Sequence, residues 1–147
     1  MDDKTAFLEL SALLTGLDKD LQLNTVKKTL NTPASEQYRR LLSASFPVKL
    51  TALLDAYRAV ASVVPKPPID DALLAVFKAT PAFQDKDAEF VTRQMVNIWY
   101  FSQYRETPTG AFLDGGFYER GFVWPLIKAH PIGFSDQPSG YWAAKPA

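Results

Sequence analysis

The segment DAEFVTRQMVNIWYFSQY, residues 87–104, carries the longest helical pattern in the chain. Its apolar side chains spread around most of the circumference of an α-helix, at Phe90, Val91, Met95, Ile98, Trp99 and Phe101. A helix that is apolar on most sides is normally buried among other elements. We therefore expect a central, largely buried helix from about Asp87 to about Tyr104. Its consecutive rings, Trp99-Tyr100-Phe101, are expected to fill the core rather than to bind a cofactor.

Two helical patterns open the chain. The first has apolar residues at intervals of three and four, at Phe7, Leu10, Leu14 and Leu17, which places them on one helical face. This helix should stop near Gly16, since glycine is the usual residue just beyond a helix end. Asp18 is a candidate cap for a second helix, whose apolar positions are Leu21, Leu23, Val26 and Leu30.

Proline and aspartate divide the middle of the chain into three more helices. The first starts at Thr32–Pro33, the second at Pro47 and the third at Asp70–Asp71. The second should stop before residues 65–68, and the third near Thr80–Pro81. Thr32 is a cap residue, Pro33 suits the first helical position, and Glu36 stands near the third position of a capping box. The Pro-Lys-Pro-Pro run at 65–68 must end a helix, because the residue before a proline avoids the helical region.

The character of the chain changes after Tyr104. Thr107–Gly110 and Asp114–Gly116 have turn chemistry, and a short helix is predicted between Tyr118 and Trp124. No strand pattern persists long enough to predict a sheet. We therefore predict an all-α fold: a single-domain helical bundle, residues 1–147, of about five to seven helices. Its helical body covers about 1–104, and a loop-rich segment with an irregular aromatic C-terminal arm covers about 105–147.

Composition narrows the classes of function. The chain has 147 residues, of which 47% are hydrophobic, so it is long enough to form a real core. The chain has 16 Lys and Arg residues and 16 Asp and Glu residues, so its formal net charge is zero. A net charge of zero argues against a nucleic-acid binder and makes self-association or a protein partner plausible. Cysteine is absent, which removes disulfides, thiolate nucleophiles and Cys-ligated metals.

The sequence shows neither a membrane span nor a leader. No run approaches the roughly 20 apolar residues that cross a bilayer, so we expect no direct membrane insertion. The start, Met1-Asp2-Asp3-Lys4, lacks the positive region and apolar stretch of a secretory signal. On these residues alone we expect a chain that is not exported on its own signal and is cytoplasmic if this start is native.

Residues that could carry chemistry have plainer interpretations. His130, the sole histidine, lies in a loop context with no recognisable partner for base catalysis. Asp85, Asp87 and Glu89 alternate like the opening of a calcium loop, but the glycine and the final glutamate of that loop are missing. The glycines of residues 110–116 have the spacing of a phosphate loop without its Lys and Ser/Thr, which indicates a turn.

The C-terminal arm is the most unusual segment. Residues 133–146 are too rich in glycine, proline and rings for a helix, yet too apolar for a freely solvated tail. We predict that the arm lies against a surface, either its own helices or a partner chain. The candidate partner-binding residues are Phe134, Pro138, Tyr141, Trp142 and Pro146. Aromatic rings dominate interface energetics, and prolines limit the entropy lost when such an arm becomes ordered.

Three blocks of residues, in this order along the chain, resemble one family. The blocks are Phe7-Leu8-Glu9-Leu10-Ser11-Ala12-Leu13-Leu14-Thr15-Gly16, Ile98-Trp99-Tyr100, and Gly140-Tyr141-Trp142 with Pro146. They are similar to segments of the small (gamma) subunit of bacterial membrane-bound FAD-dependent sorbitol, fructose and glucose dehydrogenases. The chain differs from that family's pattern in having no twin-arginine leader and no cysteine near the Gly-Tyr-Trp block. Residues 25–81 match in character more than in residue identity.

The resemblance implies a non-catalytic accessory subunit needed for the maturation of its partner. The FAD and the catalytic base would belong to a large FAD-dependent dehydrogenase subunit, and a cytochrome c subunit often takes the electrons. This chain would itself hold no cofactor and no metal. The family's small subunit often supplies an export signal, so the resemblance implies a periplasmic or membrane-associated location.

Two other classes of function stay open. The chain could be a free-standing helical interaction or regulatory module with no flavoprotein partner, which zero net charge fits equally well. It could also be an enzyme that uses Asp114 or Glu119 beside Tyr118 and Arg120, although these four residues are equally typical of a solvated helix face. The sequence does not identify the sugar or alcohol that a dehydrogenase partner would oxidise.

Overall fold

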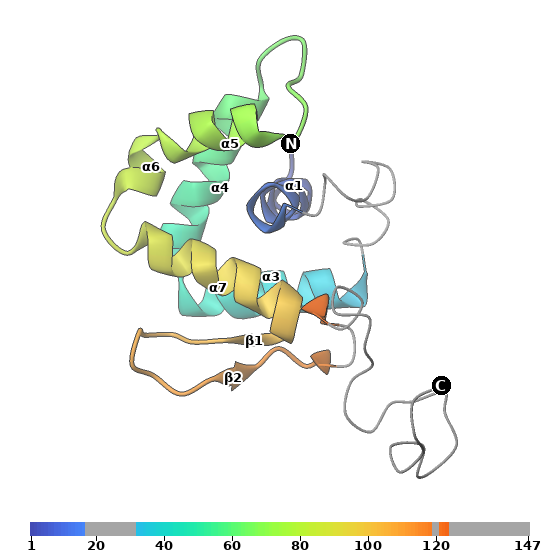
Figure 1. The fold of residues 1–147 in the computed structure, drawn as a ribbon, viewed down its shortest axis with the longest axis vertical. Helices are drawn as coiled ribbons and strands as arrows, with labels where there is room; N and C mark the ends of the chain where they lie inside the picture. The colour runs from blue at the N-terminus through green and yellow to red at the C-terminus, as the bar shows by residue number, and fades with distance from the viewer. Residues whose placement is uncertain (17–31, 119–120, 124–147) are drawn as a thin grey trace, which may run out of the picture.

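The computed structural model describes residues 1–16, 32–118 and 121–123, and these residues are mostly helical. Their elements are α1 (Asp3–Thr15), α3 (Pro33–Ser45), α4 (Pro47–Ala61), α5 (Asp71–Lys78), α6 (Pro81–Gln84), α7 (Ala88–Phe101), β1 (Gln103–Tyr104) and β2 (Leu113–Asp114). The all-α prediction is confirmed for this part of the chain (Figure 1). The helix expected from Asp18 lies outside the described residues, as do residues 119, 120 and 124 of the one expected between Tyr118 and Trp124.

The helix α1 lies among four other helices. It contacts α3, α4, α5 and α7, and Figure 1 shows it nearly end-on among them. Seven of its residues are buried: Ala6, Phe7, Glu9, Leu10, Ser11, Ala12 and Leu13. The helix α7 also has seven buried residues, and it leaves Glu89, Arg93 and Phe101 exposed. The prediction of a largely buried α7 is therefore confirmed for half of its residues. The expectation that Phe101 fills the core is wrong, because 46% of its surface is exposed.

Capping residues set the ends of the helices, largely where the sequence placed them. The Asp2 carboxylate accepts a hydrogen bond from the Thr5 N–H at the start of α1 (2.6 Å), and Gly16 ends that helix in the left-handed region with φ +68°. The Asp70 carboxylate accepts from the Leu73 N–H at 2.9 Å and caps α5. Pro47 occupies the first turn of α4, which ends at Ala61 before the proline run.

The start of α3 differs from the predicted capping box. Thr32 and Pro33 hold the expected cap and first-turn positions, but the Thr32 side chain makes no capping hydrogen bond. The N3 residue is Ser35, whose hydroxyl donates to the Thr32 carbonyl at 2.7 Å. Glu36 is one position further along and pairs with Arg39 at 2.7 Å. The capping-box prediction is wrong, because the sequence count placed Glu36 one residue too early.

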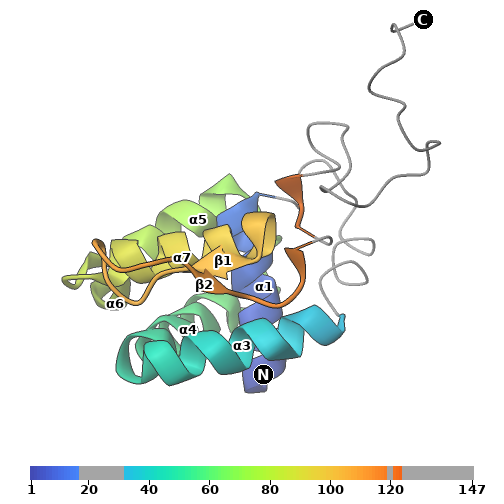
Figure 2. The same cartoon turned by 90° about the horizontal axis from the view of Figure 1, so that it is seen from below.

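The long helix α7 ends three residues earlier than predicted. Ser102 adopts φ +51°, which breaks the helix, and the chain then pairs antiparallel with Gln103 opposite Asp114 and Tyr104 opposite Leu113. This two-strand ladder runs alongside α7 (Figures 1 and 2). Strands of two residues are too short to leave an alternating pattern, so the sequence predicted neither β1 nor β2.

Aromatic rings fill the core near the end of α7. Trp99 is buried and stacks on Phe122, with ring centroids 5.7 Å apart and planes 6° apart. Tyr38 meets Trp99 edge-on at 5.1 Å. The expectation that Trp99 belongs to the core is confirmed. On α5 the structure buries Leu73 and Phe77, whereas Val76 is exposed.

Candidate functional site

The residues predicted to bind a partner all belong to the C-terminal arm. Phe134, Pro138, Tyr141, Trp142 and Pro146 lie outside the described residues. The same holds for His130, Glu119 and Arg120. The role of the arm in binding a partner therefore stays a prediction.

Three of the carboxylates considered as catalytic or metal-binding groups, Asp85, Glu89 and Asp114, have structural partners. Asp85 pairs with Lys49, and Glu89 pairs with Arg93 on the same helix. Asp87 precedes α7 with a positive φ of 70°, and Asp114 accepts a hydrogen bond from the Gly116 N–H at 2.7 Å. In residues 1–16, 32–118 and 121–123, no group of three or more His, Asp or Glu side chains is placed to hold a metal ion.

Ser102 attaches the β1–β2 hairpin to the helical body. Its hydroxyl oxygen accepts from the buried Tyr38 hydroxyl at 3.0 Å and from the Phe117 N–H at 2.9 Å. Its carbonyl accepts from the Gly115 N–H at 2.6 Å. A Cβ at Gly115 would lie 2.9 Å from that carbonyl oxygen, so the close approach of the two chain segments requires glycine there. The hairpin is thereby held against α7.

A surface groove of about 490 Å³ lies between α7 and the loop of this hairpin. It is lined by Phe90, Arg93, Gln94, Val96, Asn97, Arg105, Pro108 and Phe112. Helical spacing explains the α7 contribution, because residues 90, 93, 94 and 97 share one side of a helix. The hairpin register places Arg105 opposite Phe112, one step beyond the Tyr104–Leu113 pair.

Arg105 is held in this groove by three contacts. Its guanidinium lies over the Phe112 ring, 3.8 Å from the centroid, and its Nη1 donates to the Pro108 carbonyl at 3.2 Å. Its backbone N–H donates to Gln94 Oε1 at 2.8 Å. Its Nε is buried and has no hydrogen-bond partner among the described residues. The guanidinium is thus fixed in orientation, and part of its donor capacity is unused.

A second groove lies on the other side of α7. It has a volume of about 330 Å³ and is lined by Leu14, Leu74, Lys78, Phe83, Glu89, Thr92, Arg93 and Val96. Arg93 and Val96 line both grooves, so this edge of α7 forms the ridge between them. Unlike the first groove, the second has an acidic side chain, Glu89, in its wall beside its two cations.

Glu9 is the most deeply buried charged side chain described, with 2% of its surface exposed. Its Oε2 accepts from the Tyr57 hydroxyl at 2.9 Å, and its Oε1 accepts from Lys66 Nζ at 2.6 Å. These contacts join α1, α4 and the loop between α4 and α5. A carboxylate this inaccessible cannot meet a substrate, so we assign Glu9 a role in holding that loop.

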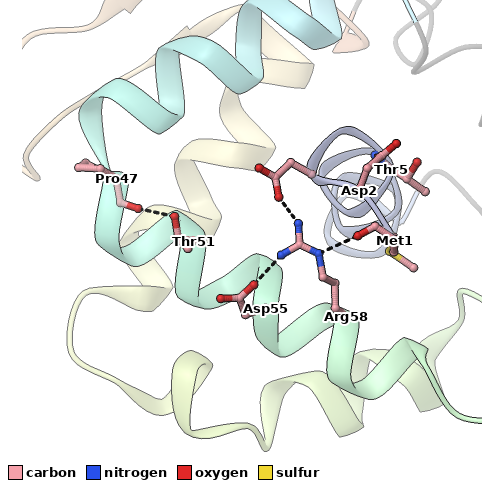
Figure 3. Close-up of polar contacts among 8 residues, drawn as sticks. Met1, Asp2, Thr5, Pro47, Thr51, Asp55 and Arg58 are labelled. Carbon is pink, nitrogen blue, oxygen red and sulfur yellow. Dashed lines mark hydrogen bonds and ion pairs between the residues drawn. The ribbon is translucent and has the colours of Figure 1, made fainter.

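Arg58 joins the start of α1 to α4 (Figure 3). Its guanidinium donates to Asp55, to Asp3 and, at 3.2 Å, to the Met1 carbonyl. Nearby, the hydrogen bond from the Thr5 backbone N–H lowers the pKa of Asp2 below its ordinary value. The hydrogen bond from Arg39 lowers the pKa of Glu36, and the one from Lys49 lowers the pKa of Asp85. Asp2 and Asp85 are exposed and Glu36 is half-buried, and all three stabilise helices or the connections between them.

Sequence reasoning missed the groove residues Arg105, Asn97 and Phe112. The available signal was the Thr107-Pro108-Thr109-Gly110 turn, because a hairpin closed around it would bring Arg105 opposite Phe112. Chemically, the groove offers two guanidinium groups, two amides and aromatic surface, which suits binding a ligand rather than making or breaking bonds.

Comparison of the chain with protein-family models, with curated proteins and with solved structures found no match. Among the helices of the described ranges, none is long and apolar enough to cross a bilayer. The functional proposal below therefore depends on the residues of the chain and on their arrangement.

Proposed function

We propose that this chain is a non-catalytic accessory subunit that binds and stabilises a large FAD-dependent sugar or alcohol dehydrogenase subunit. The observation that carries the proposal is the ordered set of three blocks, of which two fall in α1 and α7 and the third in the C-terminal arm. The FAD and the catalytic base belong to the partner, and a cytochrome c subunit is a further candidate member of the complex. This chain then works where its partner works, at the periplasmic side or the membrane surface.

The helical body supports this proposal by presenting apolar side chains at its surface. Phe101 at the end of α7 is 46% exposed and Phe112 on the hairpin is 54% exposed. Exposed rings on a body of zero net charge favour protein binding, because interface centres are rich in aromatic side chains and poor in charge.

The test is affinity capture of the full-length chain, carrying a removable tag, from cells of its native host. We expect a large yellow protein to be retained, which releases FAD on denaturation. Tyr141→Ala and Trp142→Ala should each weaken retention by about 30-fold, which corresponds to the loss of about 2 kcal/mol typical of an aromatic anchor. Val48→Ala, at an exposed apolar position of α4, is the matched control and should retain the partner fully.

Capture without any flavin would refute the proposal. A chain that elutes alone from size-exclusion chromatography, as a monomer or dimer, would instead favour the free-standing interaction module. Turnover of a sugar by the isolated chain with an electron acceptor and without added flavin would show that it is an enzyme in its own right.

A further inference from the structure

We propose that the groove between α7 and the β1–β2 hairpin binds an extended acidic segment of the partner subunit. This inference rests on the proposed function and adds a second contact, on the helical body, to the one predicted for the C-terminal arm. The occupant is a short stretch of the partner's chain that carries an aspartate or glutamate next to an apolar side chain.

The charge of the groove selects an acidic occupant. Its lining contains two arginines, Arg93 and Arg105, two amides and four apolar residues, and no acidic side chain. Arg93 pairs with Glu89 outside the groove, but both side chains are more than 70% exposed, at 72% and 71%. Exposed pairs of this kind contribute little, so Arg93 can exchange Glu89 for an incoming carboxylate at small cost.

Arg105 is the anchor of the site. Within the described residues no carboxylate lies within ion-pair distance of it. Phe112 and Pro108 already fix its guanidinium, so a carboxylate that binds there loses little side-chain freedom of the arginine. A guanidinium binds a carboxylate through two parallel hydrogen bonds, which is the strongest form of this contact.

The rest of the lining favours a peptide over a small carboxylate. The Asn97 side chain makes no hydrogen bond to the described residues and can pair with the backbone of an extended chain. Phe90 and Phe112 supply apolar surface for a neighbouring side chain. The exposure of Phe112 and Arg93 shows that the groove is open, so a small ligand would stay largely solvated. A segment of a larger protein would be covered by its own subunit.

The first experiment measures retention of the flavoprotein by groove variants. Arg105→Gln and Arg93→Gln should together weaken retention by about tenfold or more, because they leave a desolvated carboxylate of the partner without its counter-charge. Arg105→Lys should give an intermediate loss, since it keeps the charge but not the two-pronged hydrogen bonding. The control is Arg40→Gln, which removes one exposed charge from α3 and should change nothing.

The second experiment uses the isolated full-length chain and needs no partner. A synthetic six-residue peptide of alternating Phe and Asp is titrated into ¹⁵N-labelled protein, beside a peptide of alternating Phe and Asn. We expect the acidic peptide to shift the amide signals of Asn97, Arg105 and Phe112 at submillimolar concentration, and the Phe–Asn peptide to be at least about tenfold weaker. Arg105→Gln should abolish the difference between the two peptides.

The outcomes separate this inference from the proposed function. Unchanged retention by the double variant, with correct folding by circular dichroism, overturns the groove inference and leaves the accessory-subunit proposal standing. Absence of any retained flavoprotein, with specific binding of the Phe–Asp peptide, overturns the proposed partner and keeps the acidic-peptide groove. Equal binding of both peptides, or shifts centred on the second groove at Leu74 and Lys78, contradicts the groove inference.

Discussion

At the scale of single residues, the energetics of the structure are clearest around Glu9. Removing a polar partner from a buried carboxylate leaves a charge that water cannot reach, whereas removing an exposed charge changes little. Lys66 is the cation beside Glu9, and half of its side chain, 50%, is exposed. The charge of Lys66 can therefore be solvated, but that of Glu9 cannot.

Lys66→Met should destabilise the fold by about 1–3 kcal/mol, because it keeps the aliphatic stem and removes the charge that faces Glu9. The free energy of unfolding from urea titration measures the effect. Lys86→Met, at an exposed loop position, is the control and should stay within about 0.5 kcal/mol of the parent. Equal stability of the two variants would show that the Glu9–Lys66 contact does not matter.

Residue roles of this kind could be predicted from the sequence only where they are local. The end of α1 at Gly16 and the capping of α5 by Asp70 depend on neighbours three or four residues away, and both follow from the residue types. The contacts of Glu9 with Tyr57 and Lys66 join residues 48 and 57 positions apart. Nothing in the sequence pattern fixes such a pairing before α1 and α4 pack together.

At the scale of elements, the N-terminus of α5 tests whether the capping residue predicted from the sequence stabilises its helix. Asp70→Ala should cost about 1 kcal/mol of stability, because the Leu73 N–H at the start of α5 loses its acceptor. Asp70→Asn should cost only a few tenths of that, since asparagine caps a helix about as well. Urea titration of the two variants distinguishes them. A loss equal in both would mean that charge, not capping, accounts for the preference.

The elements that the sequence missed are short or set by tertiary contacts. The four-residue helix α6 and the two-residue strands carry no periodic signal, and they form where the chain turns against α7. The exposed edge of α7 was misjudged for a related reason. Counting apolar residues predicted a largely buried helix with Phe101 in the core, whereas Phe101, like Glu89 and Arg93, is exposed.

At the scale of the whole molecule, paired carboxylates make stability depend on pH. Hydrogen bonds lower the pKa of Asp2, Glu36 and Asp85 in the folded chain. A carboxylate with a lowered folded pKa stabilises the fold above its unfolded pKa, and this contribution is lost as the pH falls through the folded pKa. The ordinary values are 3.8 for aspartate and 4.5 for glutamate.

The free energy of unfolding should therefore be level from neutral pH down to about pH 5 and should fall as the pH drops further. Asp85→Asn should make that fall shallower, because asparagine has no proton to gain. Urea titrations from pH 7 down to about pH 2 measure both curves. An Asp85→Asn curve that runs parallel to the parent curve throughout would contradict the role of the Lys49–Asp85 pair.

The two candidate contact regions, the C-terminal arm and the groove between α7 and the hairpin, differ in how far the sequence predicts them. The C-terminal arm could be singled out from composition alone, since residues 133–146 combine rings with turn formers. The groove could not, because Arg105 comes from the hairpin, whereas Arg93 and Asn97 come from α7. Only the pairing of Tyr104 with Leu113 brings these two parts of the surface together.

The central claim is that this helical chain acts by lending its surface to a flavoprotein that performs the chemistry. Native mass spectrometry of the tagged full-length chain, purified from its own host, tests that claim most directly. We expect one copy of this chain in complex with a larger subunit that contains FAD, and sugar- or alcohol-oxidising activity in that fraction only. Recovery of this chain alone or as a homo-oligomer, with no flavin in any fraction that contains it, would contradict the claim.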